Sequence, residues 1–210
     1  NCYFNLCIDN FFIDYIMRKL FLTLVLAMNF IRCLGHLIVY YTHPNRLLIT
    51  ADIQVWVKTL KKRYCNTIGL IYLLAMYPEF RNLFYHRVGN VKYILNLFCR
   101  KMQALNIDMY VKIGGGCFIN HGFATAIGAK SIGKNCRINQ QVTIGDFYGG
   151  KPIIKDNVRI HSGAIIIGNI IIGNNVVIGA NATVFSDVPD NCTVFPAKSL
   201  FMKWSSGKEV

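Results

Sequence analysis

The sequence predicts an α+β protein in two parts: a helical N-terminal domain, residues 1–105, and a parallel β-helix of six-residue repeats, residues 106–198. The first observation behind the second part is an aliphatic residue or threonine at every sixth position. These residues are Ile113, Ile119, Thr125, Ile132, Ile138, Ile144, Ile154, Ile160, Ile166, Ile172, Ile178 and Val184. The second is a small or apolar residue four positions after each of them except Ile144. This second set is Cys117, Phe123, Ala129, Cys136, Val142, Val158, Ala164, Ile170, Val176, Ala182 and Val188.

The period of six indicates a solenoid. A helix needs a period near 3.6 residues and a simple strand needs 2, so six fits neither alone. A short strand followed by a tight turn repeats its inward residue every six positions, and stacked units bury one apolar column. Glycine and asparagine, as in residues 173–175, supply the backbone dihedrals that the corners require. The pattern is interrupted by one extra residue, placed before Ile132, and by a four-residue insertion around residues 146–153.

Residues 17–105 show apolar residues at three- and four-residue spacing, which indicates helices. Thr50 to Asp52 predicts a helix start, and Pro44 and Pro78 predict helix boundaries. Met17 is a candidate natural start, which would make residues 1–16 an upstream extension. After the two predicted domains, residues 199–210 are assigned to a C-terminal tail.

A largely apolar run covers residues 20–31, between Lys19 and Arg32. It is shorter than the roughly 20 residues that span a bilayer. The basic residues before it are typical of a signal peptide, but no small-x-small cleavage site follows. A buried helix or a helix on a membrane surface fits better. We therefore expect a cytoplasmic protein, with membrane-surface contact through this helix as an open alternative.

The net charge of +13 indicates a basic surface. Such a surface attracts nucleic acid, an anionic membrane or a phosphate-rich small molecule. No aromatic RNA-binding motif or zinc finger is recognisable, so no nucleic-acid partner is expected. The eight cysteines include no CxxC pair and fit reduced thiols that act as small apolar residues. Only His121 and His161 lie in the repeat region, too few for a three-histidine zinc site, and no metal is predicted.

Two stretches of the repeat region, Lys112 to Asp146 and Ile154 to Asn191, resemble the bacterial serine O-acetyltransferase family. The helical stretch Tyr77 to Gly89 resembles the end of that family's helical domain, and the similarity covers about residues 50–198. It implies a left-handed coil, which is an exception to the usual right-handed crossover. It also implies a homotrimer or a dimer of trimers, in which acetyl-CoA lies between neighbouring coils and donates its acetyl group to a small-molecule hydroxyl.

The family's catalytic histidine matches His121, in the segment from Ile119 to Phe123. The residues agree with that role, because His121 lies two positions past an inward residue and next to Gly122. An imidazole titrates near neutral pH and can remove a proton from an attacking hydroxyl. Backbone N–H groups of glycine-rich turns can stabilise the resulting oxyanion.

Several positions differ from the family pattern. The aspartate that orients the family's histidine is Asn106 here, and Asp108 is a possible substitute. An asparagine can set the imidazole tautomer but stabilises the imidazolium less. The aspartate before the histidine is Asn120, and Lys151 stands in place of part of an Arg-His pair that holds the amino acid. The helical domain also has no aspartate between Asp52 and Asp108. The resemblance to the family therefore predicts the type of reaction better than it predicts the acceptor.

By resemblance, small residues line the groove for the pantetheine arm of CoA: Gly145, Gly163, Ala180 and Ser186. Lys198 would face the CoA phosphates. His161 is interpreted as a surface or groove-lining residue that could approach CoA. His86 is interpreted as structural.

Three functions follow as hypotheses. The first is serine O-acetyltransferase, which the helical stretch favours. The second is an O-acetyltransferase for a sugar or polysaccharide hydroxyl, which the altered serine-binding positions favour. The third is a non-catalytic β-helix that acts as an assembly module, which Asn106 keeps open.

Overall fold

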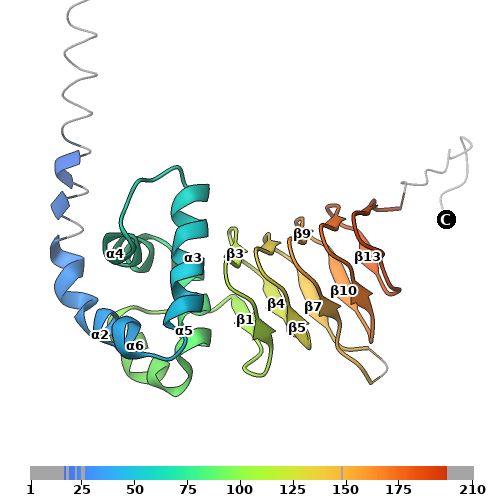
Figure 1. Ribbon diagram of the computed structural model, residues 1–210, viewed down its shortest axis with the longest axis horizontal. Coiled ribbons are helices and arrows are strands. Elements are labelled where there is room, and N and C mark those ends of the chain that lie inside the picture. The colour runs from blue at the N-terminus through green and yellow to red at the C-terminus, as the bar shows by residue number, and fades with distance from the viewer. Residues whose placement is uncertain (1–16, 18, 22, 25–26, 148, 198–210) are drawn as a thin grey trace, which may run out of the picture.

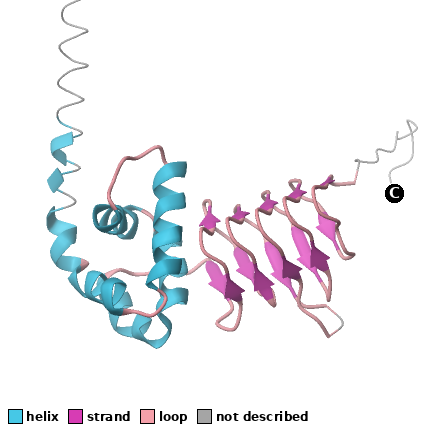
Figure 2. Ribbon diagram, viewed as in Figure 1, coloured by secondary structure: helices cyan, strands magenta, loops and turns pink. Residues whose placement is uncertain are grey.

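The computed structural model describes residues 17–197 except residues 18, 22, 25, 26 and 148. Helices pack together at one end, and the strands stack into a column that leads away from them (Figure 1). The predicted order of N-terminal helices followed by a parallel β-helix is confirmed (Figure 2). The predicted extension, residues 1–16, and the predicted tail, residues 199–210, lie outside the described residues. Among the residues that are described, no helix combines the length and apolar character needed to cross a membrane.

Prolines mark the helix boundaries as predicted. From residue 34 on, the helices are α2 (Leu34–Thr42), α3 (Arg46–Thr59), α4 (Asn66–Met76), α5 (Pro78–Val88), the 3-10 turn η1 (Gly89–Val91) and α6 (Lys92–Phe98). Pro44 lies between α2 and α3, and Pro78 is the first residue of α5, where its missing N–H is not needed. The predicted helix start at Thr50 to Asp52 is wrong. Helix α3 begins at Arg46, and the buried Asp52 accepts hydrogen bonds from outside its own helix.

The β-helix has three parallel sheets, one on each side of the coil. Sheet A contains β1 (Leu105–Ile107), β4 (Thr125–Ile127), β7 (Thr143–Gly145), β10 (Ile165–Ile167) and β13 (Thr183–Val184). Sheet B contains β2 (Lys112–Ile113), β5 (Ser131–Ile132), β8 (Ile153–Ile154) and β11 (Ile171–Ile172). Sheet C contains β3 (Phe118–Ile119), β6 (Arg137–Ile138), β9 (Arg159–Ile160), β12 (Val177–Ile178) and β14 (Thr193–Val194). Each pair is in register, so equivalent aliphatic residues stack directly over one another.

The extra residue in the repeat lies elsewhere than predicted. Ile127, not Thr125, pairs with the inward Ile144, and Ala126 pairs with Thr143. Thr125 therefore occupies the place that Phe123 was expected to fill, and Phe123 is 58% exposed instead. Two residues are inserted between Ile119 and Ile127, and one is missing between Ile127 and Ile132. The net excess is still one residue, which is why counting along the chain misplaced it. The four-residue insertion is confirmed, since the inward Ile154 lies ten positions after the inward Ile144 instead of six.

Asparagines build the corner between sheets B and C. Asn135, Asn157, Asn175 and Asn191 have φ values of 56°, 60°, 57° and 62°. Asparagine tolerates this left-handed region better than most residues. The side-chain amide of Asn157 donates to Asn175, and that of Asn175 to Asn191, at 3.1 and 2.8 Å. The corner residues thus both permit the turn and tie successive coils together.

Helices α3 and α5 close the first coil of the β-helix. The buried Trp56 ring lies 4.5 Å from the ring of Phe118, and its N–H donates to the Cys117 carbonyl at 2.8 Å. A Cβ on Gly115 would lie 2.9 Å from that of Ala51, so only glycine permits this approach. The helices therefore cover the end of the apolar column that a free first coil would expose.

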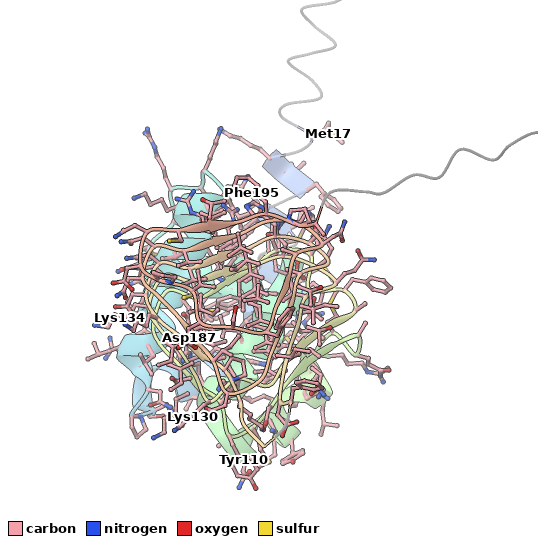
Figure 3. All side chains as sticks on the ribbon, turned by 90° about the vertical axis from the view of Figure 1, so that its right-hand side faces the viewer. Met17, Tyr110, Lys130, Lys134, Asp187 and Phe195 are labelled. Atoms are coloured by element: carbon pink, nitrogen blue, oxygen red, sulfur yellow. The ribbon has the colours of Figure 1, made fainter. Side chains whose placement is uncertain are left out.

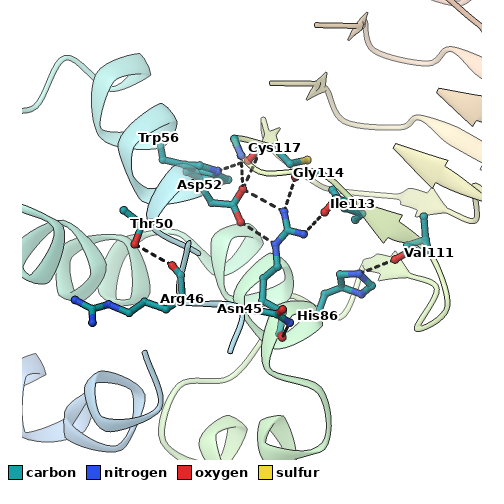
Figure 4. Close-up of polar contacts among 12 residues, drawn as sticks. Asn45, Arg46, Thr50, Asp52, Trp56, His86, Val111, Ile113, Gly114 and Cys117 are labelled. Carbon is teal, nitrogen blue, oxygen red and sulfur yellow. Dashed lines mark hydrogen bonds and ion pairs between the residues drawn. The ribbon is translucent and has the colours of Figure 1, made fainter. Parts of the chain in front are cut away.

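A buried ion pair joins the same elements (Figure 4). The Arg87 guanidinium on α5 donates to Asp52 on α3 at 2.9 Å and to the Gly114 carbonyl at 2.7 Å. Asp52 also accepts from the backbone N–H groups of Gly116 and Cys117, at 2.8 and 3.0 Å. Burial raises the pKa of Asp52, and the Arg87 guanidinium and both amides oppose that rise. Every hydrogen-bond partner of the carboxylate is a donor, which is the arrangement that the ionised form requires.

Candidate active site

His121 lies in the two-residue insertion that the register reveals. The loop of residues 120–124 leaves sheet C after β3 and enters sheet A at β4. His121 and Ala124 have φ values of 57° and 51°, so the loop turns sharply twice. His121 is exposed, whereas Gly122 is buried. The insertion therefore pushes an imidazole out of an otherwise regular corner.

Close packing holds this loop in place. A Cβ on Gly122 would lie 3.0 Å from the Leu105 side chain and 3.2 Å from the Cβ of Glu79. The Asn120 N–H donates to the Ile138 carbonyl, and the Gln141 N–H donates to the Phe123 carbonyl, both at 2.8 Å. The loop is thus fixed by sheet hydrogen bonds on one side and by α5 on the other.

Asn106 lies in the middle of β1 and pairs with Ala126 of β4. Its side chain is exposed on the outer side of sheet A, on the strand next to the one that follows the His121 loop. It lines a pocket of about 120 Å³ together with His86 and Met109. His86 hydrogen-bonds the Val111 carbonyl at 2.9 Å, and burial lowers the pKa of this histidine. A neutral, hydrogen-bonded His86 fits the structural role predicted for it.

Asp108 and Lys151, 43 residues apart, form an ion pair. Asp108 follows β1, and Lys151 belongs to the four-residue insertion before β8. The Lys151 ammonium, hydrogen-bonded to Asp108, lowers the pKa of that carboxyl, and the Tyr110 N–H adds to the effect. In the described part of the chain Asp108 therefore contacts Lys151, at the end of the sheet A strands away from the His121 loop.

The ion pair borders a basic pocket of about 580 Å³. Its lining includes Lys112, Lys130, Lys151 and Asp146. Lys130 and Tyr110, which also lines it, project along the same edge of the coil (Figure 3). Such a pocket suits an anionic group, and Asp108 and Asp146 offset part of its positive charge.

We expect substitution of Lys151 by methionine to raise the pKa of Asp108 toward its ordinary value, because its main hydrogen-bond donor is lost. The folded pKa of Asp108 is depressed, so its stabilising contribution is present above the unfolded pKa, near 4. That contribution is lost as the pH falls through the folded value. A carboxyl NMR titration measures the shift directly. Lys130→Met, which removes a cation from the same pocket, should leave the Asp108 titration nearly unchanged; an equal shift in both variants would contradict the pairing.

The four predicted groove residues fall at two ends of the sheet A strands. Gly163 and Ala180 lie at the corner before β10 and β13, where the His121 loop precedes β4. Gly163 has a φ of 72°, and a Cβ there would lie 2.1 Å from the Asn181 side chain. Gly145 ends β7, and the exposed Ser186 follows β13, at the opposite corner. Lys198 lies outside the described residues.

His161 is exposed on the same edge of the coil as His121. It follows β9, as the His121 loop follows β3, and β6 lies between these strands in sheet C. Two strand spacings place them roughly 10 Å apart along the stack. That separation is too large for a shared metal, but both histidines border the corner that holds Gly163 and Ala180.

Glu79 was not singled out from the sequence. It is a buried residue in the first turn of α5, against the His121 loop. Its position in the stretch from Tyr77 to Gly89 carries no distinguishing signal, because acidic residues are common in the first turn of any helix. Only the packing of α5 on the first coil places this residue next to the loop.

The chain is similar to hexapeptide-repeat transferases in sequence. Residues 151–186 match the family described as bacterial transferase hexapeptide (six repeats). The chain is 38% identical over 136 residues to the serine acetyltransferase of Synechococcus elongatus, covering 58% of this chain and 56% of that one. It is 33% identical over 141 residues to the serine acetyltransferase of Helicobacter pylori strain J99, covering 60% of this chain and 82% of that one. The chain thus spans little more than half of the first relative and most of the second.

Solved structures show the same fold. Neisseria gonorrhoeae serine acetyltransferase in complex with serine superposes with a TM-score of 0.59 at 26% identity, covering 76% of this chain and 69% of that chain. Entamoeba histolytica serine acetyltransferase isoform 3 in complex with cysteine superposes with a TM-score of 0.61 at 28% identity, covering 77% and 61%. In each case the similarity covers more residues than the repeat region alone holds.

Proposed function

The chain belongs to the serine acetyltransferase family, and on that premise we propose that it transfers an acetyl group from acetyl-CoA to the hydroxyl of L-serine. The observation that carries the proposal is the exposed His121 on the inserted loop, at the position that the family's catalytic histidine matches. The relative from Neisseria gonorrhoeae was solved with serine, which supports the acceptor.

In the proposed reaction the neutral His121 ring removes the proton from the acceptor hydroxyl. The oxygen attacks the thioester carbonyl of acetyl-CoA, and backbone N–H groups stabilise the tetrahedral oxyanion. The intermediate collapses with cleavage of the C–S bond. The imidazolium then returns its proton to the CoA thiolate, leaving the O-acetyl product, CoA and a neutral histidine.

The surrounding residues take supporting roles in this proposal. Asn106, on the strand beside the His121 loop, orients the imidazole, and Asn120 faces the acceptor. Asp108 and Lys151 lie at the other end of the sheet A strands, so Asp108 as the alternative orienting group and Lys151 as an acceptor contact would act on the His121 loop of a neighbouring coil. Small residues give room to the pantetheine arm of CoA, and Lys198 faces its phosphates. The groove residues are Gly145, Gly163, Ala180 and Ser186. These four residues fall at two corners of one coil. All four can therefore line a groove of one kind if the groove forms between neighbouring coils of a homotrimer, or of a dimer of trimers.

A sugar or polysaccharide hydroxyl is the second candidate acceptor. The Asp108–Lys151 ion pair favours it, because the cation that would face the carboxylate of serine already has a carboxylate partner. The same base and donor serve either acceptor, so the choice concerns only the acceptor side of the site.

We also propose that the protein acts in the cytoplasm. The cysteines that the structure describes are free thiols, as a reducing compartment would leave them. Exposed apolar residues before α2, such as Met28, Phe30 and Ile31, would be the surface that contacts a membrane.

The test is release of free thiol from acetyl-CoA with a panel of acceptors that includes L-serine and sugars. Turnover with serine supports the first acceptor, and turnover with sugars alone supports the second. If no acceptor gives release above that of a His121 variant, the acetyltransferase proposal fails and a non-catalytic assembly module takes its place.

A further inference from the structure

Two thiols and one imidazole meet in the interior of the helical domain, away from the candidate active site. Cys33 precedes α2, His36 lies in its first turn, and Cys99 follows α6. The three residues are 0%, 0% and 1% exposed. The two sulfur atoms are 3.8 Å apart, and one ligand atom from each residue lies within 4.8 Å of the others.

The hydrogen bonds of Tyr85 determine which ring nitrogen of His36 is free. The Tyr85 hydroxyl has one hydrogen, which it donates to the backbone carbonyl of Cys99 or Leu95. Its oxygen then accepts from the Nε2–H of His36, at 2.9 Å. The remaining nitrogen, Nδ1, therefore carries a lone pair, and it is buried with no hydrogen-bond partner. An unpaired acceptor of this kind is costly in a protein interior.

We propose that Cys33 Sγ, Cys99 Sγ and His36 Nδ1 bind one zinc ion. Two thiolates on a tetrahedral zinc, each about 2.3 Å from the metal, lie roughly 3.8 Å apart. That separation is the one between these two sulfurs. Thiolate and imidazole are the ligands that zinc prefers over harder cations. The bond from the other ring nitrogen to Tyr85 is the outer contact that orients zinc-binding histidines.

The charges around the cluster fit such an ion. Two thiolates balance the charge of a divalent cation, and Arg81 is already bound by the carbonyls of Leu74, Ala75 and Arg100.

The position of the cluster indicates a structural role for the metal. Cys33 and Cys99 are 66 residues apart, and Cys99 stands six residues before the first strand, β1. An ion held between them would tie the segment before α2 to the segment that leads into the β-helix. Metal binding of this kind stabilises the folded state, because the unfolded chain does not preform the site.

The experiment measures metal content and cobalt spectra on the full chain, purified without chelators. We expect one zinc per chain, exchangeable for cobalt with the charge-transfer absorption of a cobalt thiolate. Cys33→Ala and Cys99→Ala should reduce the bound zinc at least tenfold, whereas Cys65→Ala, which removes an exposed thiol, should retain it. A chelator should lower the thermal midpoint of the wild type and leave that of Cys33→Ala unchanged.

Circular dichroism establishes that each variant is folded before its metal content is compared. Folded wild type without zinc, and without a thiolate spectrum on cobalt addition, would overturn the proposal. So would a Cys33–Cys99 disulfide, seen as a chain lighter by two hydrogens and reversed by a reductant instead of a chelator. None of these readouts depends on acetyl transfer, so failure here and failure of the proposed enzyme activity are distinguishable.

Discussion

Substituting His121 by asparagine is expected to lower kcat for acetyl transfer about 10²- to 10⁴-fold, which is the usual contribution of a general base. Asparagine keeps a polar side chain but has no nitrogen that takes up a proton near neutral pH. It also tolerates the left-handed backbone that His121 adopts, with its φ of 57°, better than alanine does. Steady-state thiol release at saturating acetyl-CoA measures the loss.

His161→Asn is the matched control for this prediction. It removes the other exposed imidazole of the same edge and should change kcat far less. Thermal midpoints of both variants should stay close to that of the wild type, because neither side chain is buried. Equal losses in the two variants, or full activity in His121→Asn, would contradict the assignment of His121 as the base.

Substituting Asp52 by alanine is expected to lower the free energy of unfolding by about 3–5 kcal/mol, the range for removing one partner of a buried ion pair. The Arg87 guanidinium would lose its counter-ion while remaining buried. The N–H groups of Gly116 and Cys117 would lose their acceptor as well. Urea unfolding followed by circular dichroism measures the change.

Asp108→Ala serves as the control for Asp52→Ala, because it removes a carboxylate from an ion pair that is partly exposed to solvent. Solvent screens such a pair, so its loss should have a much smaller effect. Asp52→Asn keeps the size of the side chain and an acceptor oxygen, and it should fall between the two. A small effect of Asp52→Ala would show that the junction between α3, α5 and the first coil does not depend on this ion pair.

Most of the β-helix follows from the sequence because its determinants are local. Each coil is built from the same unit of a short strand and a tight turn, so inward residues such as Ile160 and Ile178 recur at a fixed spacing. The exception is the loop that carries His121. An insertion of two residues and a deletion of one leave the same net count as a single insertion. Only the pairing of Ile127 with Ile144 separates these possibilities.

The helix boundaries likewise separate into those that the local sequence predicts and those that it does not. Pro44 and Pro78 were informative because proline restricts the backbone whatever surrounds it. Thr50 to Asp52 was misleading because a short polar side chain at a helix start and one buried inside a helix look alike in sequence. The partner of Asp52 is Arg87, 35 residues away, and nothing local announces it.

The sequence by itself therefore determined the repeat, the asparagine corners and the choice of His121 as candidate base, whereas the path of the loop that carries His121 needed the pairing of β4 with β7. Each depends on residues within one coil or on a motif of a few neighbours. Only the tertiary structure decided the pairing of Asp108 with Lys151, the packing of Glu79 against the His121 loop, and the meeting of Cys33 with Cys99. These residues lie between 42 and 66 positions apart. Such contacts form only when separate elements pack against one another. A periodic pattern predicts the local structure of each coil, but it does not show which residues far apart in the sequence come into contact.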